Sequence, residues 1–225
     1  MKTKFALLAA VLLAAAGLRA GEKPQPTTIT NTEAKKWVEE AEAAVKQGDL
    51  EESFKCYGKA AKLEDSLPLH RRLAHFYFDT AEKTKNDNWA EFQASVERWN
   101  KAKDGAMEDR RSLFTGKYKK FNPENRTYVD ATTKHQKILD VIEICFPLYD
   151  KAMEGFNAIM RLSPHNSDFD AAGHMPLCLA SKGEVMMRMR TRQLLNAFLM
   201  GYKPSNDAEK ALYKRCQDIL DKWNR

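Results

Sequence analysis

Apolar residues recur at helical spacing through most of the chain, and Ala, Glu, Lys, Leu and Met fill many of the positions between them. Runs that alternate between β-branched and polar residues, which are typical of strands, are nearly absent. The pattern therefore predicts an all-α protein.

Polar residues mark the ends of the first two predicted helices. Thr30 and Glu33 have the spacing of a capping box, in which each side chain accepts a hydrogen bond from a free backbone N–H at the start of a helix. The first helix is predicted to run to about Lys46, and a second helix follows a turn at Gly48 and ends near Leu63. Two helices joined by so short a turn form an antiparallel hairpin.

The close-packed positions of this hairpin carry small or aromatic residues. Small residues let two helices approach closely, and aromatic residues fill the wedge between neighbouring hairpins. This arrangement resembles a tetratricopeptide repeat over residues 34–67, although Glu40 and Ala44 stand where the family favours leucine and tyrosine. The residues that carry the resemblance are Trp37, Ala41, Gly48, Ser53, Tyr57 and Ala60.

Two later stretches resemble the same repeat. Residues 67–104 have the small and aromatic residues of a second hairpin, interrupted by the polar stretch 79–88. In residues 133–166, Ala152 and Phe156 precede a helix-stopping proline at the family's spacing. The resemblance implies antiparallel helical hairpins stacked as a short solenoid, with a C-terminal capping helix.

The remaining segments are predicted to be an insertion and capping helices. Residues 104–132 interrupt the repeats. Residues 168–225 are predicted to be helical, with a break at Pro176 and a last helix from Asp207 to Trp223. The apolar stripe of that last helix can cover the end of the stack while its charged face stays in water.

The N-terminus predicts export. Lys2 and Lys4 precede an apolar run that ends at Ala16, and small residues follow it, which is the pattern of a secretory signal peptide. We expect cleavage after Ala20, with Ala16 as the alternative, so that residues 1–20 are the signal peptide. Residues 21–30 would then be a flexible stretch before the repeat domain at 31–225. No later apolar segment is long enough to span a membrane, so the mature protein is expected to be soluble in the periplasm or elsewhere in the cell envelope.

Charge and cysteine content limit the choice of partner and cofactor. The net charge of +6 falls to +3 without the signal peptide, because Lys2, Lys4 and Arg19 leave with it. So small an excess does not predict a nucleic-acid partner. The four cysteines form no CxxC pair, so no zinc or redox site is predicted. Two alternatives remain for the cysteines: they form one disulfide, or all four are buried thiols. The residues are Cys56, Cys145, Cys178 and Cys216.

We find no motif of a catalytic nucleophile with its base, of paired carboxylates or of a phosphate-binding loop, and we therefore predict neither enzymatic activity nor a cofactor. The densest group of metal-ligand types is His165, Asp168, Asp170 and His174. Ser167 and Asp170 are better explained as a second capping box, so we predict no tight copper or zinc site.

The insertion carries basic residues between aromatic ones. Over residues 110–128, arginine and lysine side chains alternate with Phe114, Tyr118, Phe121 and Tyr128. Such a segment can bind an acidic glycan, a lipid headgroup or an acidic protein. Alternatively, its aromatic side chains dock on the helical repeats, since a buried aromatic residue contributes roughly 1.5 to 3 kcal/mol.

The resemblance also implies a function. Tetratricopeptide repeats bind peptides or protein domains in a concave groove lined by their first helices. We therefore expect a scaffold or adaptor in the cell envelope; the alternatives are a structural component that self-associates and, third, a metal-binding periplasmic protein. The oligomeric state is not predicted. The family's groove positions correspond here to Lys35, Val38, Glu42, Val45, Arg71, His75, Phe78, Lys137 and Val141.

Overall fold

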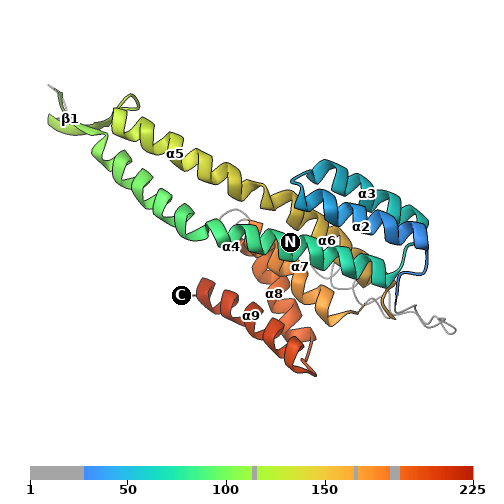
Figure 1. Cartoon of the computed structure of the whole chain (residues 1–225). Helices are drawn as coiled ribbons and strands as arrows, with labels where there is room; N and C mark the ends of the chain where they lie inside the picture. Colours follow the sequence, from blue (N-terminus) through green and yellow to red (C-terminus); the bar gives the residue numbers. More distant parts are fainter. Residues whose placement is uncertain (1–27, 113–115, 165–166, 183–187, 225) are drawn as a thin grey trace. The chain divides into compact units, whose positions relative to one another are not determined.

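The computed structural model describes residues 28–112, 116–164, 167–182 and 188–224 (Figure 1). Helices predominate in these residues, which confirms the all-α class, and one small two-stranded sheet accompanies them. The predicted signal peptide lies outside the described residues. The elements are α2 (Thr32–Lys46), α3 (Leu50–Leu63), α4 (Leu67–Gly105), β1 (Met107–Ser112), β2 (Gly116–Phe121), α5 (Arg126–Glu143), α6 (Cys145–Leu162), α7 (Phe169–Lys182), α8 (Arg188–Gly201) and α9 (Asp207–Asn224).

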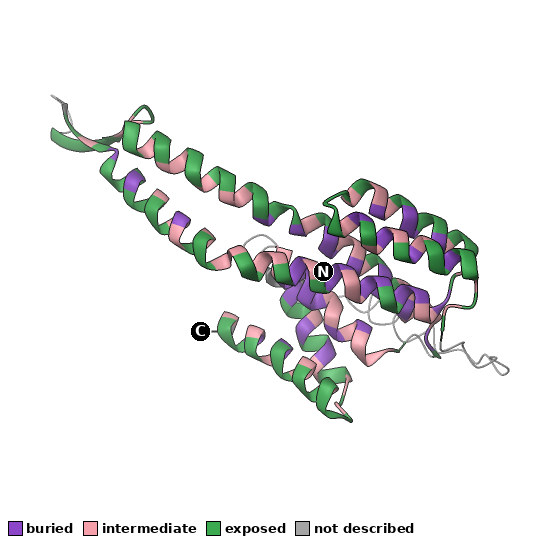
Figure 2. Ribbon diagram, in the orientation of Figure 1, coloured by how far each residue is buried: buried purple, intermediate pink, exposed green. Residues whose placement is uncertain are grey.

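The described residues form two compact units rather than one repeat array. Unit 1 contains α2, α3 and α4 up to Phe78, together with the chain from Tyr149 onward. Unit 2 is Asp79–Leu148 and contains the rest of α4, the sheet and α5. Buried residues are dense in the helices of unit 1, whereas the helices of unit 2 carry mostly exposed and half-buried ones (Figure 2).

The first predicted hairpin is present as α2 and α3. Gly48 has a φ of +84° in the turn, a conformation that glycine adopts without a steric penalty. Asp49 then starts α3 by accepting a hydrogen bond from the Glu52 backbone N–H at 2.9 Å. The predicted capping box at the start of α2 is wrong, because Asn31 is the capping residue and the backbone N–H of Thr30 donates to the Glu64 carboxylate instead.

Buried hydroxyl groups join this hairpin to α4 inside unit 1. The Ser53 hydroxyl lies 2.8 Å from the carbonyl oxygen of Ala41 and 2.9 Å from the hydroxyl of Tyr77. Burial raises the pKa of Tyr77 to about 12, although its hydrogen bond to Ser53 lowers it, so the phenol keeps its proton and remains a donor. Three helices therefore share one satisfied polar contact at their centre.

The second predicted hairpin is wrong, because α4 is one continuous helix from Leu67 to Gly105. The polar stretch 79–88, which we interpreted as a turn, contains neither glycine nor proline. Its side chains instead bond to the helix itself: the Thr84 hydroxyl donates to the Thr80 carbonyl oxygen, and the Asn88 amide donates to the Thr84 carbonyl oxygen. Polarity alone does not end a helix when no breaker residue is present.

The third predicted hairpin is also absent. Only Ile144 separates α5 from α6, and its φ of −56° and ψ of −28° are helical, so the chain does not reverse there. Pro147 accounts for the interruption, since it has no N–H to donate to the carbonyl group four residues earlier.

The predicted insertion at 104–132 is a β-hairpin followed by the start of α5. Strands β1 and β2 pair antiparallel, with Met107 opposite Phe121 and Arg110 opposite Tyr118. Gly116 has a φ of +71° at the start of β2. Asn125 then starts α5 by accepting a hydrogen bond from the Tyr128 backbone N–H. The charged strands lack the apolar alternation on which strand prediction depends.

The C-terminal helices α7, α8 and α9 pack against one another in unit 1. Helix α7 passes through Pro176, so the predicted break there is wrong. The last predicted helix is present as α9, and its Cys216 and Leu220 are buried. All four cysteines are buried and none forms a disulfide. No helix in the described part of the chain is long and apolar enough to cross a membrane.

Gly155 of α6 packs closely against Ala74 of α4 in unit 1. A Cβ atom at position 155 would lie 2.8 Å from the Ala74 Cβ and 3.3 Å from its Cα. We predict that Gly155→Ala destabilises the protein by about 1 to 3 kcal/mol, because one of the two helices must move. The free energy of unfolding from urea titration checks this.

Gly58→Ala is the matched control for that substitution. Gly58 lies inside α3, and a Cβ there would meet no atom within 4 Å. Alanine should therefore raise stability by about 0.5 to 1 kcal/mol through helix propensity alone. Equal effects of the two substitutions would contradict the close packing at Gly155.

Candidate functional site

The structure separates the predicted groove residues. Val38 and Phe78 are 0% and 2% exposed, so they belong to the core and their assignment to a binding surface is wrong. Glu42 is paired with Arg72, with Nε to Oε1 at 2.7 Å. Lys35 is exposed and Val45 is half-buried on α2.

Lys137 and Val141 are exposed on α5, which belongs to unit 2. They are therefore not part of the same compact unit as the other predicted groove residues. Arg71 and His75, by contrast, lie one turn apart on α4 in unit 1, and both take part in a polar cluster with α7.

A carboxylate and two imidazoles form the centre of this cluster. His75 Nε2 lies 2.6 Å from Asp170 Oδ2. His174 Nδ1 lies 3.1 Å from Asp170 Oδ1 and 2.9 Å from the backbone carbonyl oxygen of Asp170, one helical turn earlier. Two helices whose contacting residues are 95 positions apart in sequence thus place three polar side chains together.

Aromatic rings hold both imidazoles in place. The His174 ring stacks on Phe156 with centroids 5.0 Å apart and an interplanar angle of 16°. His75 meets the same Phe156 ring edge to face at 5.3 Å, and the two imidazoles are 4.9 Å apart. Phe78 packs edge to face against His174. Because Phe156 and Phe78 are buried, the rings form a fixed apolar wall behind the polar groups.

A second ion pair fixes the start of α7 beside the cluster. The Arg71 guanidinium donates to Asp168, and the other carboxylate oxygen of Asp168 accepts the Ala171 backbone N–H at 2.9 Å. Asp168 is thus the residue that caps α7, and the predicted capping box of Ser167 and Asp170 is wrong. The Asp170 carboxylate is directed to the two histidines instead.

The cluster opens into a cleft. One part has a volume of about 390 Å³ and is lined by Arg71, His75, Asp168, Phe169, Asp170 and Glu209. A neighbouring part of about 490 Å³ is lined by His174 and by residues of α7 and α9. The side chains of His75, Asp170 and His174 are 31%, 35% and 14% exposed, so solvent reaches the polar atoms.

The environment of Asp170 favours its charged form. Burial alone would raise the pKa of this carboxyl group, but its hydrogen bonds to His174 and His75 outweigh that effect and hold the pKa well below its usual range. The carboxylate is therefore ionised at neutral pH.

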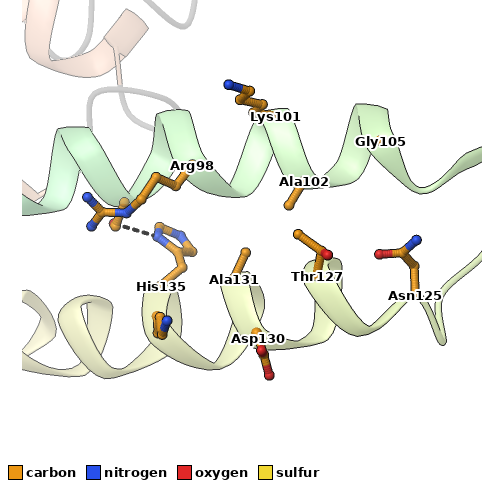
Figure 3. Close-up of a pocket in the computed structure, with 11 residues that line it drawn as sticks. Arg98, Lys101, Ala102, Gly105, Asn125, Thr127, Asp130, Ala131 and His135 are labelled. Carbon is orange, nitrogen blue, oxygen red and sulfur yellow. Dashed lines mark hydrogen bonds between the residues drawn. The ribbon is translucent and has the colours of Figure 1, made fainter.

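Unit 2 contains a second cleft, of about 520 Å³, between α4 and α5 (Figure 3). Figure 3 shows Ala102, Thr127 and Ala131 facing one another across it, and these small side chains leave the space between the helices unfilled. Arg98 extends toward His135, whose Nδ1 lies 2.9 Å from the Ser95 hydroxyl. Lys101, Asp130 and Lys134 also line the cleft, and Figure 3 shows the charged ends of Lys101 and Asp130 directed away from it.

In the basic and aromatic segment of the insertion, some aromatic side chains pack on the helices and others are exposed to solvent. Phe121 packs edge to face on Tyr128 with centroids 5.0 Å apart, and Tyr128 lies against Trp99 of α4. Tyr118 is 45% exposed at the middle of β2, and its strand neighbours Lys117, Lys119 and Lys120 are exposed. Phe114 lies outside the described residues.

The thiols contribute no reactive group to either cleft. Burial raises the pKa of Cys145 to about 11 and that of Cys216 to about 12, so both remain protonated at neutral pH. Cys178 is also buried. His165 lies outside the described residues.

Comparisons of the chain with protein-family models, curated proteins and solved structures found no match.

We predict that Asp170→Asn lowers the melting temperature at pH 7. The gap in melting temperature between this variant and the wild type should narrow as the pH falls from 5 to 3. The folded-state pKa of Asp170 is depressed, so the carboxylate stabilises the fold above its unfolded pKa of about 3.9 and loses that contribution on protonation. Thermal melting across this pH range is the measurement. Asp218→Asn, at an exposed position of α9, should follow the wild type at every pH; a constant Asp170→Asn difference would contradict the carboxylate's role.

Proposed function

We propose that the protein is a non-enzymatic adaptor that binds an acidic segment of a protein partner through unit 2. The observation that carries the proposal is the exposed basic surface of the β-hairpin. This hairpin connects α4 to α5, the two helices that line the cleft in unit 2. We call these elements, α4 from Asp79, β1, β2 and α5, the arm.

The charge of the β-hairpin supports an acidic ligand. Residues 107–121 contain five basic and two acidic residues. Lys117, Lys119 and Lys120 are exposed on β2, and Tyr118 is positioned between them to contact a peptide through its ring. Exposed cations of this kind accelerate association and select for acidic partners more than they add affinity.

The β-hairpin is held firmly on the helix pair, which favours a preformed binding surface. The Asn122 backbone N–H donates to the Ala106 carbonyl oxygen at 2.9 Å and closes the base of the hairpin. The Trp99 indole N–H donates to the Thr132 hydroxyl at 3.1 Å and so joins α4 to α5 beneath it. A surface that is already ordered loses less conformational entropy when it binds.

The cleft between α4 and α5 extends the basic surface. Arg98 and Lys134 line it, and the Arg98 side chain extends toward His135 inside it (Figure 3). Small side chains leave it deep enough to receive a side chain of a partner. We infer that a carboxylate side chain near Arg98 and His135 would anchor the partner there, while flanking acidic residues meet β2.

The resemblance to tetratricopeptide repeats supports an adaptor in general terms, through the hairpin of α2 and α3 and its contact with α4. The family's groove positions give little support to a binding surface on unit 1, because Val38 and Phe78 are buried and Glu42 is paired with Arg72. We therefore place the partner on the arm rather than in a groove along the first helices.

A second candidate function, self-association as a structural component, is favoured by exposed apolar residues at the C-terminal end of α5. Val141 and Ile144 are 38% and 50% exposed, and with Lys137 they follow the spacing of one helical face. Light scattering on the purified protein distinguishes the candidates: a monomer supports the adaptor, and a stable oligomer supports the structural component.

We further propose that the adaptor works in the cell envelope after removal of residues 1–20. The support is the charged start, the apolar run and the small residues Ala16, Gly17 and Ala20. Intact-mass measurement of protein recovered from an envelope fraction should give Gly21 as the first residue. A full-length chain recovered from the cytoplasm would contradict export.

We predict that Lys119→Glu with Lys120→Glu weakens binding of a fluorescent poly-glutamate peptide by about tenfold at low salt, because two attractions become repulsions. The difference should shrink at high salt, since ions screen exposed charges. Fluorescence anisotropy at both salt concentrations measures the affinity, and circular dichroism confirms that the variant is folded.

The matched control is Lys35→Glu with Lys62→Glu, which makes the same change in net charge on exposed residues of α2 and α3. It should bind the peptide as the wild type does. If both variants lost affinity equally, overall charge would explain the effect. If only the control lost affinity, the binding surface would lie on unit 1 instead. Tighter binding to anionic vesicles or to an acidic polysaccharide than to the peptide would replace the protein partner with that ligand.

A further inference from the structure

The cluster in unit 1 has the composition and spacing of a metal site. His75, Asp170 and His174 each offer one ligand atom, and these atoms lie within 4.8 Å of one another. They come from α4 and α7, so the packing of the two helices, rather than a local motif, brings them together. This site is separate from the arm to which we assign partner binding.

The ligand types select a class of ion. Imidazole nitrogen suits Zn²⁺, Cu²⁺, Ni²⁺ and Fe²⁺, whereas Mg²⁺ and Ca²⁺ prefer oxygen ligands alone. The set offers one carboxylate and two imidazoles, and a histidine binds a metal ion through its neutral imidazole. Three protein ligands also leave coordination positions for water or another ligand, as in catalytic rather than structural zinc sites.

The surroundings of the three residues fit such a site. Phe156 contacts both imidazole rings, and Phe78 packs edge to face against His174. The Arg71 to Asp168 ion pair holds the start of α7, and therefore Asp170, at a set position along α4. The cleft lined by Glu209 and Arg71 gives an ion a path from solvent.

We propose that His75 Nε2, His174 Nδ1 and the Asp170 carboxylate bind one divalent transition-metal ion of the zinc type, with the open coordination positions facing the cleft. Each imidazole binds the ion in its neutral form, through the ring nitrogen that faces Asp170 and with its single proton on the other ring nitrogen.

Binding requires only a small movement. Zinc bonds of 2.0 to 2.1 Å in tetrahedral geometry place two ligand atoms about 3.3 Å apart. His75 Nε2 and Asp170 Oδ2 are 2.6 Å apart in the hydrogen-bonded cluster, and His174 Nδ1 and Asp170 Oδ1 are 3.1 Å apart. Rotation of the Asp170 carboxylate opens the shorter distance, and the two imidazole nitrogens, which lie within 4.8 Å of each other, approach the same ion.

Equilibrium dialysis of untagged protein against Zn²⁺, followed by elemental analysis, tests the site. The wild type should bind about one ion per chain. His75→Gln and Asp170→Asn should each weaken zinc binding by at least about tenfold, since each removes one ligand. His135→Gln, which changes a histidine of unit 2, is the matched control and should bind zinc as the wild type does.

Three results would overturn the site: no zinc bound by the folded wild type, equal zinc in the wild type and both ligand variants, or displacement of zinc by equimolar Mg²⁺. Circular dichroism shows whether each variant is folded. Asp170→Asn preserves the shape of the side chain and decides the question if His75→Gln does not fold. Peptide binding by the arm is expected to be the same in the ligand variants, so failure of the metal site and failure of the adaptor function are distinguishable.

Discussion

The close approach of two helix backbones at Ala74 and Gly155 determines much of unit 1. A side chain at position 155 would fill the space that the helices share. The residues that follow, His75 on α4 and Phe156 on α6, are consequently brought into edge-to-face contact, and Phe156 in turn supports His174. The packing of the core and the geometry of the polar cluster are therefore one constraint, which explains why a metal-ligand set can exist here without any local sequence motif.

The sequence predicted the fold where local signals were sufficient. The glycine turn at Gly48 and the apolar periodicity on either side of it predicted α2 and α3. The same reasoning failed in α4, because the polar stretch 79–88 has the composition of a loop but contains no residue that ends a helix, and its side chains bond to the helix backbone. The β-hairpin was missed because its strands are charged on both faces and lack apolar alternation.

The candidate site was predictable only in parts. The sequence indicated Asp170 and His174 as ligand types and His75 as a groove residue, but nothing local connects residues 95 positions apart. It also assigned the start of α7 to Ser167 and Asp170, whereas Asp168 caps the helix and leaves Asp170 to the histidines. The missed contact between His75 and Asp170 and the wrong capping residue of α7 have the same origin. A carboxylate near the start of a helix can bond to the backbone or to a distant side chain, and tertiary packing decides which.

Unit 2 is inserted into unit 1, and this has a consequence for folding. The residues on either side of the insertion, Phe78 and Tyr149, have ring centroids 6.2 Å apart inside unit 1. Unit 2 is a contiguous stretch of chain, whereas unit 1 needs both ends of the polypeptide and cannot be completed until the C-terminal helices have been made. An arm that forms first converts a long flexible loop into a short rigid one and lowers the entropic cost of joining the two halves of unit 1. The state of the arm therefore affects how readily the two halves of unit 1 meet during folding.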